Sequence, residues 1–216
     1  MRVGVLASGE GTNLQALIDS PHGAAAPVAT GGTIAAPAGR IEVVAVASDK
    51  AAAPALTRAR ASAIATETFP RERFASRSAR DAAITAWLDE RGVELVVLAG
   101  YMALLDAAFV RRWAGRLVNV HPSLLPAFPG VRAIEQALDY GVALFGVTVH
   151  LVDEGVDTGP ILLQEALALP EARTPDEVHD ALRPIEHRLL CTTVQAFAAG
   201  AVRPDRAHPR RWLVDA

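Results

Sequence analysis

The sequence is poor in several residue types, and each scarcity limits what the protein can be. Cys191 is the only cysteine, so the chain can form no internal disulfide and no cysteine-based metal cluster. A single thiol fits a reducing compartment, and we expect a cytoplasmic location. The apolar run over residues 1–7 ends too early for a signal-peptide core, and no apolar run reaches membrane-spanning length. We therefore expect a soluble protein with no membrane partner.

The chain also lacks a large excess of charge of either sign. The chain has 21 Lys+Arg against 24 Asp+Glu, a formal net charge of −3 and an isoelectric point of about 6.1. General nucleic-acid binders carry a basic face, so we expect no nucleic-acid partner. What the chain has is apolar content, since 51% of its 216 residues are hydrophobic. That is enough for a substantial core and predicts a single α/β domain over residues 1–216.

Asparagine is also rare. It occurs only at Asn13 and Asn119, in a chain rich in Ala and Arg whose sole lysine is Lys50. In so skewed a composition we expect each asparagine to meet a local requirement. Both fall in or beside loops that are candidates for a functional site.

Apolar runs and helical periodicities alternate through the first part of the chain. Residues 2–7, 41–47, 63–66, 94–99 and 116–120 predict strands, and residues 51–60, 79–91 and 106–113 predict helices. Residues 20–40, rich in Ala, Gly and Pro, predict a surface loop, and 71–80 a charged, solvated connection. The alternation predicts a Rossmann-like, doubly wound, mostly parallel sheet.

The loop after the first strand is a candidate anion site. Thr12 and Gln15 have capping-box spacing, which predicts a helix starting at Thr12 with free backbone amides at its N-terminus. Gly9 and Gly11 supply two glycines of a dinucleotide fingerprint, but Leu14 takes the third position, and the lysine of a P-loop is absent. We favour a single phosphate held by Gly11, Thr12 and Asn13. The alternative is a plain strand-to-helix turn.

The C-terminal part changes pattern. Residues 146–152 alternate with period two, 161–169 form a second extended run, and a turn-rich loop separates them, which predicts an antiparallel hairpin. Thr174, Pro175 and Glu177 predict the start of a final helix, and Pro184 should interrupt and kink it. We expect the polar tail, residues 201–216, to pack along the surface.

Asn119 and His121 end a buried strand. Pro122 and Pro126 follow and lack amide hydrogens, so the chain must leave the sheet there as a loop. Side chains two residues apart on a strand point to the same side, which places an amide and an imidazole together. The pair suits acyl transfer, because Asn can stabilise an oxyanion and His can move a proton at neutral pH. The alternative is a turn that merely caps the strand.

Asp157, in the loop of the predicted hairpin, is the candidate acid for this pair, because a carboxylate favours a charged imidazole. Asp before Thr-Gly-Pro is also ordinary turn chemistry. His150 is the competing histidine, although a strand histidine is usually satisfied locally. The spacing leaves open a metal site on His121, His150 and Asp157, but no tight ligand motif supports one. Neither Ser123 nor Cys191 has the setting of a nucleophile, so we expect direct transfer without an acyl-enzyme.

Four motifs in order along the chain carry a resemblance to a known family. They are SGEGTNLQA at 8–16, LAGYM at 98–102, NVHPSLLP at 119–126 and DEGVDTGP at 153–160. With them, nearly the whole chain except residues 20–40 resembles the phosphoribosylglycinamide formyltransferases. That family transfers formyl from 10-formyltetrahydrofolate to the amine of glycinamide ribonucleotide, and the resemblance implies the same reaction here without a metal.

The resemblance also implies roles for individual residues. Residues 1–100 would form mainly the nucleotide-phosphate side, and 101–216 the catalytic and folate side. Asn119, His121 and Asp157 would be catalytic, with His121 as proton donor. The substrate-binding residues would be Gly11, Thr12, Asn13, Arg183 and Glu186. The folate-binding residues would be Arg77, Met102, Ala103, Leu104, Leu105, Asp153 and Glu154.

Three features depart from the family pattern, namely the length of the 20–40 segment, Pro184, and the absence of a histidine in residues 131–134. A formyltetrahydrofolate hydrolase should carry a domain ahead of the first strand, and a methionyl-tRNA formyltransferase a further C-terminal domain. A non-catalytic nucleotide-binding module is a third alternative, for which Asp49 near the end of the second strand would serve. The sequence does not decide between a monomer and a homodimer.

Overall fold

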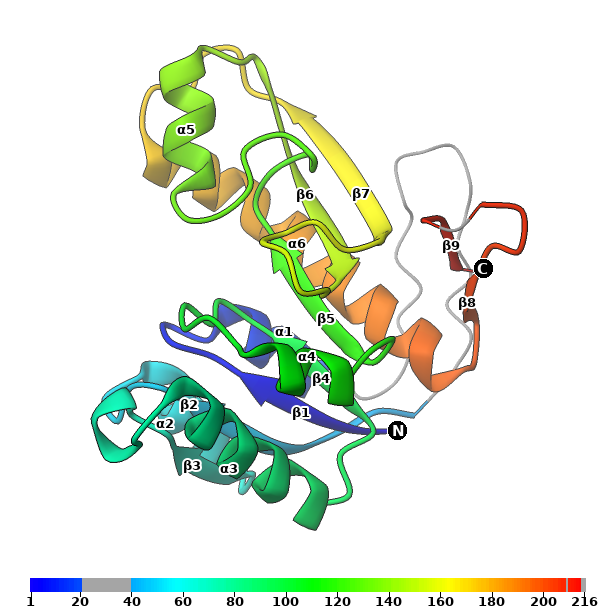
Figure 1. Ribbon diagram of the computed structural model, residues 1–216. Coiled ribbons are helices and arrows are strands. Elements are labelled where there is room, and N and C mark those ends of the chain that lie inside the picture. The colour runs from blue at the N-terminus through cyan, green and yellow to red at the C-terminus, as the bar shows by residue number, and fades with distance from the viewer. Residues whose placement is uncertain (21–39, 209, 215–216) are drawn as a thin grey trace.

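A computed structural model describes residues 1–20, 40–208 and 210–214. The loop predicted for residues 20–40 therefore lies, except for its two ends, outside the described residues. Seven strands form one sheet in the order β3-β2-β1-β4-β5-β6-β7 (Figure 1). The parallel strands are β1 (Arg2–Leu6), β2 (Glu42–Ser48), β3 (Ala65–Thr68), β4 (Leu95–Leu98) and β5 (Leu117–His121). The predicted doubly wound, mostly parallel sheet is confirmed.

The antiparallel hairpin is confirmed too. It consists of β6 (Leu144–Leu151) and β7 (Ile161–Ala168), and β6 lies antiparallel beside β5. The strand order reverses between β1 and β4, and in open α/β sheets ligands bind at the carboxyl ends of the strands at such a point. The glycine loop after β1, the loop after β4 and the end of β5 all lie on that edge.

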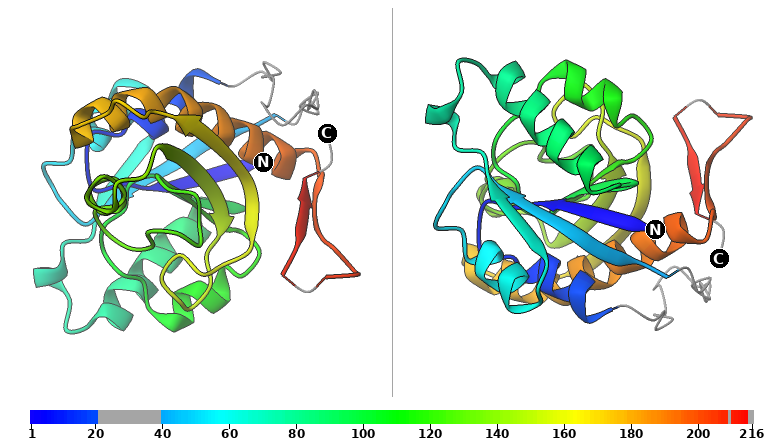
Figure 2. Two further views of the ribbon diagram at one scale, coloured as in Figure 1. Left: turned by 90° about the horizontal axis from the view of Figure 1, so that it is seen from above. Right: turned by 90° about the horizontal axis from the view of Figure 1, so that it is seen from below.

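Helices cover both faces of the sheet (Figure 2). One face carries α1 (Thr12–Asp19), α2 (Pro54–Ala61), α5 (Ala133–Tyr140) and α6 (Pro175–Ala198), and the other carries α3 (Arg77–Glu90) and α4 (Ala107–Arg112). The alternation of β1 divides its apolar side chains between two cores: Val5 belongs to the same core as Leu56 and Leu189, and Leu6 to the same core as Ile84 and Trp113. All are fully buried, as expected for a parallel strand covered on both faces.

The capping box predicted at Thr12 is wrong. Gly11 is the N-cap of α1, with φ 73°, no side-chain cap is formed, and the Gln15 amide donates instead to Asp19. The reason is the close approach of α2, because a Cβ on Gly11 would lie 2.7 Å from the Cβ of Ala55. Only glycine fits both this space and the left-handed backbone.

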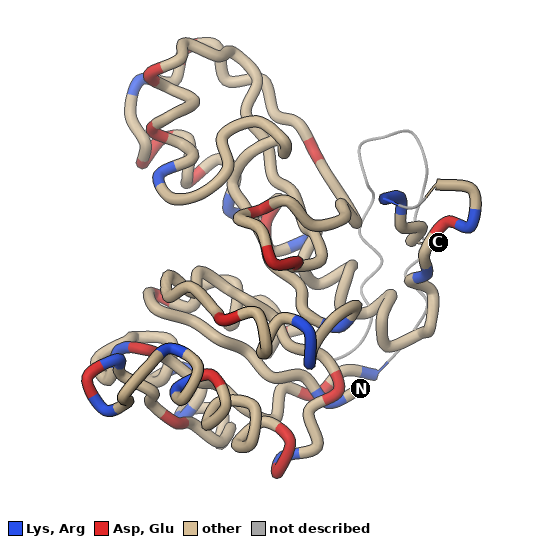
Figure 3. Tube along the Cα trace, viewed as in Figure 1, with Lys and Arg blue, Asp and Glu red and all other residues tan. Residues whose placement is uncertain are grey.

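The charged connection predicted for residues 71–80 is wrong in its second half. After a 3-10 turn, η1 (Arg71–Arg73), the Ser76 hydroxyl caps α3 by accepting a hydrogen bond from Ala79 N at 3.1 Å. Helix α3 therefore begins at Arg77, and Arg80 falls on its buried face with Ile84 and Leu88. Charged residues of both signs occur along η1 and α3 (Figure 3).

The C-terminal part differs from prediction in two places. The capping box of Thr174 and Glu177 is confirmed, but α6 continues through Pro184, where we predicted an interruption. Burial of Leu182, Ile185 and Leu189 offsets the single hydrogen bond that Pro184 cannot make. The tail forms a hairpin, β8 (Val202–Pro204) with β9 (Trp212–Val214), that packs beside β7. Strands of three residues leave too short an alternation to be predicted.

Candidate active site

The end of β5 places Asn119 and His121 as the strand periodicity predicts. Val118 and Val120 point into the core, while Asn119 and His121 share the other side. Parallel pairing with β4 and antiparallel pairing with β6 hold the strand on both edges, and Asn119 lies opposite His150. Two polar side chains thus stand on a rigid central strand and not on a mobile loop.

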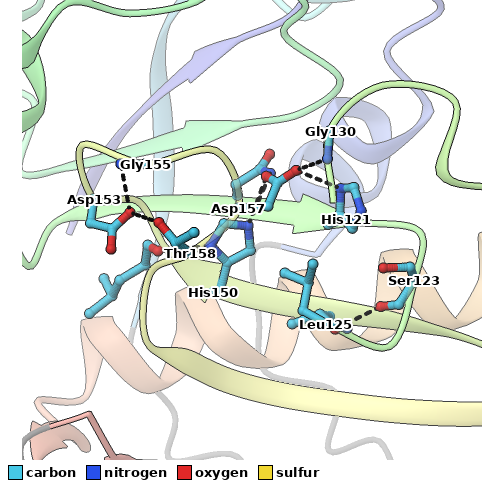
Figure 4. Close-up of polar contacts among 12 residues, drawn as sticks. His121, Ser123, Leu125, Gly130, His150, Asp153, Gly155, Asp157 and Thr158 are labelled. Atoms are coloured by element: carbon cyan, nitrogen blue, oxygen red, sulfur yellow. Dashed lines mark hydrogen bonds and ion pairs between the residues drawn. The ribbon is translucent and has the colours of Figure 1, made fainter. Parts of the chain in front are cut away.

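Asp157 reaches this pair from the loop between β6 and β7 (Figure 4). Its Oδ1 accepts a hydrogen bond from Asn119 Nδ2 at 3.3 Å, and its Oδ2 lies 3.4 Å from His121 Nδ1. Gly130 N also donates to Oδ2, at 2.7 Å. The backbone of Asp157 is left-handed, with φ 53°, which aspartate tolerates better than most residues. The structure thus brings the three residues together.

Asp157 is an anion at neutral pH. Its burial on its own would raise the pKa of the carboxyl group. Hydrogen bonds from His150 and Gly130 N, together with the charges of His121 and His150, outweigh this and hold the pKa of Asp157 below its usual value. The site therefore contains a fixed negative charge beside two imidazoles.

His121 has an acceptor at each ring nitrogen. Nε2 lies 2.9 Å from Phe128 O, and Nδ1 faces Asp157. A carbonyl oxygen only accepts, so Nε2 donates to Phe128 O, while Nδ1 lies beside a carboxylate that is also an acceptor. Two acceptors on opposite sides of the ring stabilise its charged form when both nitrogens carry hydrogen. Ser123 Oγ donates to Ala127 O at 2.6 Å, which folds the following loop back toward this ring.

His150 belongs to the cluster, contrary to the expectation that it would be satisfied locally. One ring nitrogen is indeed local, since Nδ1 lies 2.8 Å from Leu151 O. The other, Nε2, lies 3.2 Å from Asn119 Nδ2 and 3.5 Å from Asp157 Oδ1. A signal was available, because a histidine in the apolar run of β6 would face a polar residue of β5 once the two strands paired.

The proposed phosphate loop meets α6 through one contact. Asn13 Nδ2 donates to Glu186 Oε2 at 3.0 Å, and Glu186 is only 5% exposed. Gly11 and Thr12 lie at the start of α1 beside Asn13. Arg183 is not brought to this pair, because its guanidinium binds Asp180 of its own helix at 2.6 Å. The structure thus joins the glycine loop to Glu186 and leaves Arg183 apart.

The segment after β4 contains the predicted folate contacts at residues 102–105. Met102 and Leu104 are each 60% exposed, and Ala103 and Leu105 lie between and beside them. Arg77 is exposed at the first turn of α3. Arg80, which we did not predict, reaches the segment instead, with its guanidinium 2.8 Å from Leu104 O.

Arg80 is held in a buried pair with Asp81. The two side chains are 2.7 Å apart, and Asp81 Oδ2 accepts a hydrogen bond from Asp106 N at 2.6 Å. Burial raises the pKa of Asp81, although the bonds from Asp106 N and Arg80 act in the opposite direction. Helical spacing from Arg80 to Ile84 and Leu88 was the signal that could have marked this arginine as buried.

The loop between β6 and β7 gathers three acidic residues, Asp153, Glu154 and Asp157 (Figure 3). Asp153 Oδ1 accepts hydrogen bonds from Gly155 N at 3.1 Å and from the Thr158 hydroxyl at 2.6 Å, which closes the loop on itself (Figure 4). Glu154 pairs with Arg111 of α4 at 2.8 Å on the surface. Of the three, only Asp157 turns toward β5.

Within the described residues, no group of three His, Cys, Asp or Glu side chains is placed to hold a metal ion. Across the same residues, no helix has both the length and the apolar character needed to cross a membrane.

The chain has clear relatives. Residues 1–194 match the formyl transferase family. A phosphoribosylglycinamide formyltransferase of Escherichia coli strain K12 is 38% identical over 203 residues, which cover 94% of this chain and 90% of that protein. The trifunctional purine biosynthetic protein adenosine-3 of Bos taurus is 41% identical over 202 residues, which cover 94% of this chain but only 19% of that longer protein.

A solved structure agrees with these matches. The crystal structure of glycinamide ribonucleotide transformylase 1 from Symbiobacterium toebii is 39% identical, with a TM-score of 0.86, and the match covers 100% of this chain and 94% of that one. The chain thus spans about a fifth of the trifunctional relative and most of the single-function relatives.

Proposed function

Because the chain belongs to the formyl transferase family, and within it to the phosphoribosylglycinamide formyltransferases, we propose that it formylates glycinamide ribonucleotide with 10-formyltetrahydrofolate. The products are formylglycinamide ribonucleotide and tetrahydrofolate. One observation carries the proposal beyond the resemblance, namely that Asp157 lies 3.3 Å from Asn119 and 3.4 Å from His121 at the carboxyl end of β5.

The reaction is a direct transfer between two bound substrates. The amine nitrogen of the nucleotide attacks the formyl carbon, which gives a tetrahedral adduct with a negative oxygen. The bond from that carbon to N10 of the folate then breaks, and N10 keeps the electron pair. N10 takes up a proton as the amine loses one, so that charge and atoms balance without a covalent enzyme intermediate.

The three residues divide this work. The Asn119 amide donates to the oxygen of the adduct, where a preorganised donor is worth most. His121 supplies positive charge and a proton, and Asp157 stabilises its charged form. Both nitrogens of His121 face protein acceptors, so it reaches the substrate by exchanging either Phe128 O or Asp157 for a substrate atom. Such rearrangement on binding is common in active sites.

The two substrates occupy opposite sides of this cluster. Gly11, Thr12 and Asn13 bind the nucleotide phosphate at the N-terminus of α1, and Glu186, with Arg183 on the same helix, serves the ribose side. The folate lies against residues 102–105 and the loop that carries Asp153 and Glu154, with Arg77 at the outer end. No metal takes part. This arrangement assigns the nucleotide mainly to residues 1–100, and the folate and the chemistry to 101–216.

One assay separates this function from its rivals. The protein is mixed with 10-formyltetrahydrofolate, with and without glycinamide ribonucleotide, and folate deformylation is followed. Release that requires the amine is the expected result. Release into water alone would identify a hydrolase instead. Binding of a nucleotide without any release would identify a non-catalytic module.

A further inference from the structure

The carboxylate of Asp49 forms a hydrogen bond that plays no part in the proposed reaction. Asp49 follows β2, where nucleotide-binding folds often place an acid for the ribose. Here Ser8 Oγ donates to Asp49 Oδ1 at 2.5 Å, and Ser8 is only 4% exposed. That distance is typical of a hydroxyl bound to a carboxylate, a bond stronger than one between neutral groups. The acid is therefore engaged within the chain.

The same hydroxyl also accepts a hydrogen bond. Met102 N donates to Ser8 Oγ at 2.8 Å, and Ser8 N donates to Gly100 O at 3.0 Å. Ser8 thus forms hydrogen bonds with the chain after β4 at two residues, one on either side of Tyr101. Because β1 lies between β2 and β4 in the sheet, one side chain ties together the loops that follow three neighbouring strands.

We propose that Ser8, with its hydroxyl oriented by Asp49, is a positioning residue for the folate-binding segment, residues 102–105. The inference rests on the proposed function. With its hydrogen committed to Asp49, the Ser8 oxygen presents its lone pairs to Met102 N. The backbone amide that opens the segment is thereby fixed, while the Met102 and Leu104 side chains remain free to face a ligand.

The effect should be confined to one substrate. The glycine loop has supports of its own, since Ala55 N donates to Gly9 O at 3.1 Å and Arg58 Nε donates to Glu10 O at 2.7 Å. Among the side-chain hydrogen bonds described for residues 102–105, there are only those from Arg80 to Leu104 O and from Met102 N to Ser8. Loss of the hydroxyl should therefore loosen residues 102–105 and leave the phosphate loop in place.

The test is Ser8→Ala, with each ligand titrated alone by calorimetry and with steady-state kinetics. We expect the Kd and KM for 10-formyltetrahydrofolate to rise about tenfold, which corresponds to about 1.4 kcal/mol. We expect the Kd for glycinamide ribonucleotide, and kcat, to change less than about threefold. Asp49→Asn keeps an oxygen that accepts the hydrogen bond from the Ser8 hydroxyl, so it should retain nearly normal folate affinity. Asp49→Ala removes that acceptor and should lower folate affinity.

Two control variants make the result specific. Ser48→Ala removes an equally buried hydroxyl that bonds Lys50 N at 3.0 Å, and folate affinity should not change. Arg58→Ala removes a support of the glycine loop and should weaken binding of glycinamide ribonucleotide without changing folate affinity. If the wild type binds both ligands and Ser8→Ala and Asp49→Ala bind folate normally, the inference is wrong. If the wild type binds neither ligand, the proposed function fails first.

Discussion

The cluster around β5 and the cluster between α1 and α6 differ in how completely their polar atoms are paired. Around β5, both oxygens of Asp157 and both ring nitrogens of His121 and His150 have partners within the chain. On α1 and α6, Asn13 Oδ1, Arg183 Nε and His187 Nε2 are buried and have no hydrogen-bond partner among the residues that the structure describes. One cluster is complete in itself, and the other is not.

The difference matches the two tasks proposed for them. Groups that act on a reacting carbon must be oriented before the substrate arrives, so they are best held by the chain itself. Groups that only bind a ligand can be completed by that ligand. Changes in the β5 cluster should then lower kcat, while changes between α1 and α6 should raise KM. Burial lowers the pKa of His187, while the charge of Glu186 acts in the opposite direction.

The largest effect should follow from Asn119→Ala. Loss of the oxyanion donor should lower kcat by roughly 10²–10³, or about 2.7–4 kcal/mol, with KM for both substrates little changed. Steady-state kinetics measures both constants, and circular dichroism shows whether the fold is retained. If kcat stayed within about threefold of the wild type, the role of Asn119 and the contrast between the clusters would both be rejected.

A smaller effect, on KM and not on kcat, should follow from Glu186→Gln. The amide can still accept from Asn13, but the charge that we propose for the ribose side of the nucleotide is gone. We expect KM for glycinamide ribonucleotide to rise about tenfold, or about 1.4 kcal/mol, while kcat stays within about twofold. Asp176→Asn, which removes an exposed acid at the start of α6, is the matched control and should change neither constant. If Glu186→Gln lowered kcat and left KM unchanged, the proposed difference between the two clusters would be rejected.

The fold could be predicted wherever one physical signal acted alone. Buried runs such as 94–99 and the alternation of 146–152 predicted the sheet and its antiparallel hairpin correctly. The prediction failed where tertiary contact overrode a local signal. Thr12 has capping-box spacing, but the approach of Ala55 gives the N-cap to Gly11. Pro184 breaks an isolated helix, yet packing of α6 against the sheet keeps it continuous.

The candidate site shows the same limit. Asn119 and His121 could be placed together from strand period alone, because two residues on one strand need no knowledge of the fold. Asp157 needed the hairpin, and its proximity to them was a hypothesis until the geometry was available. His150 needed the register of β5 against β6, and the Phe128 carbonyl leaves no mark in a sequence at all. Their catalytic roles remain predictions.

The acid in the β5 cluster should make stability depend on pH. The pKa of Asp157 is below its unfolded value of about 3.9. Its stabilising contribution is therefore complete above that value and is lost as the pH falls through the folded pKa. Urea unfolding between pH 6 and pH 3 should show a steeper loss for the wild type than for Asp157→Asn. Glu154→Gln, an exposed residue of the same loop, should behave as the wild type does. Equal slopes for the wild type and Asp157→Asn would show that the cluster is not held together by this charge.

The smallest effect should come from the cluster between α1 and α6. If Thr12 capped α1, Thr12→Ala would cost about 1 kcal/mol of stability. Because Gly11 is the N-cap and Thr12 makes no cap bond, we expect a change within about 0.5 kcal/mol. Gly11→Ala is the opposite control and should be clearly destabilising, since it forces a Cβ against Ala55 in a left-handed conformation. Chemical denaturation measures both, and a cost near 1 kcal/mol for Thr12→Ala would mean that this loop, like the β5 cluster, depends on side-chain bonds for its shape.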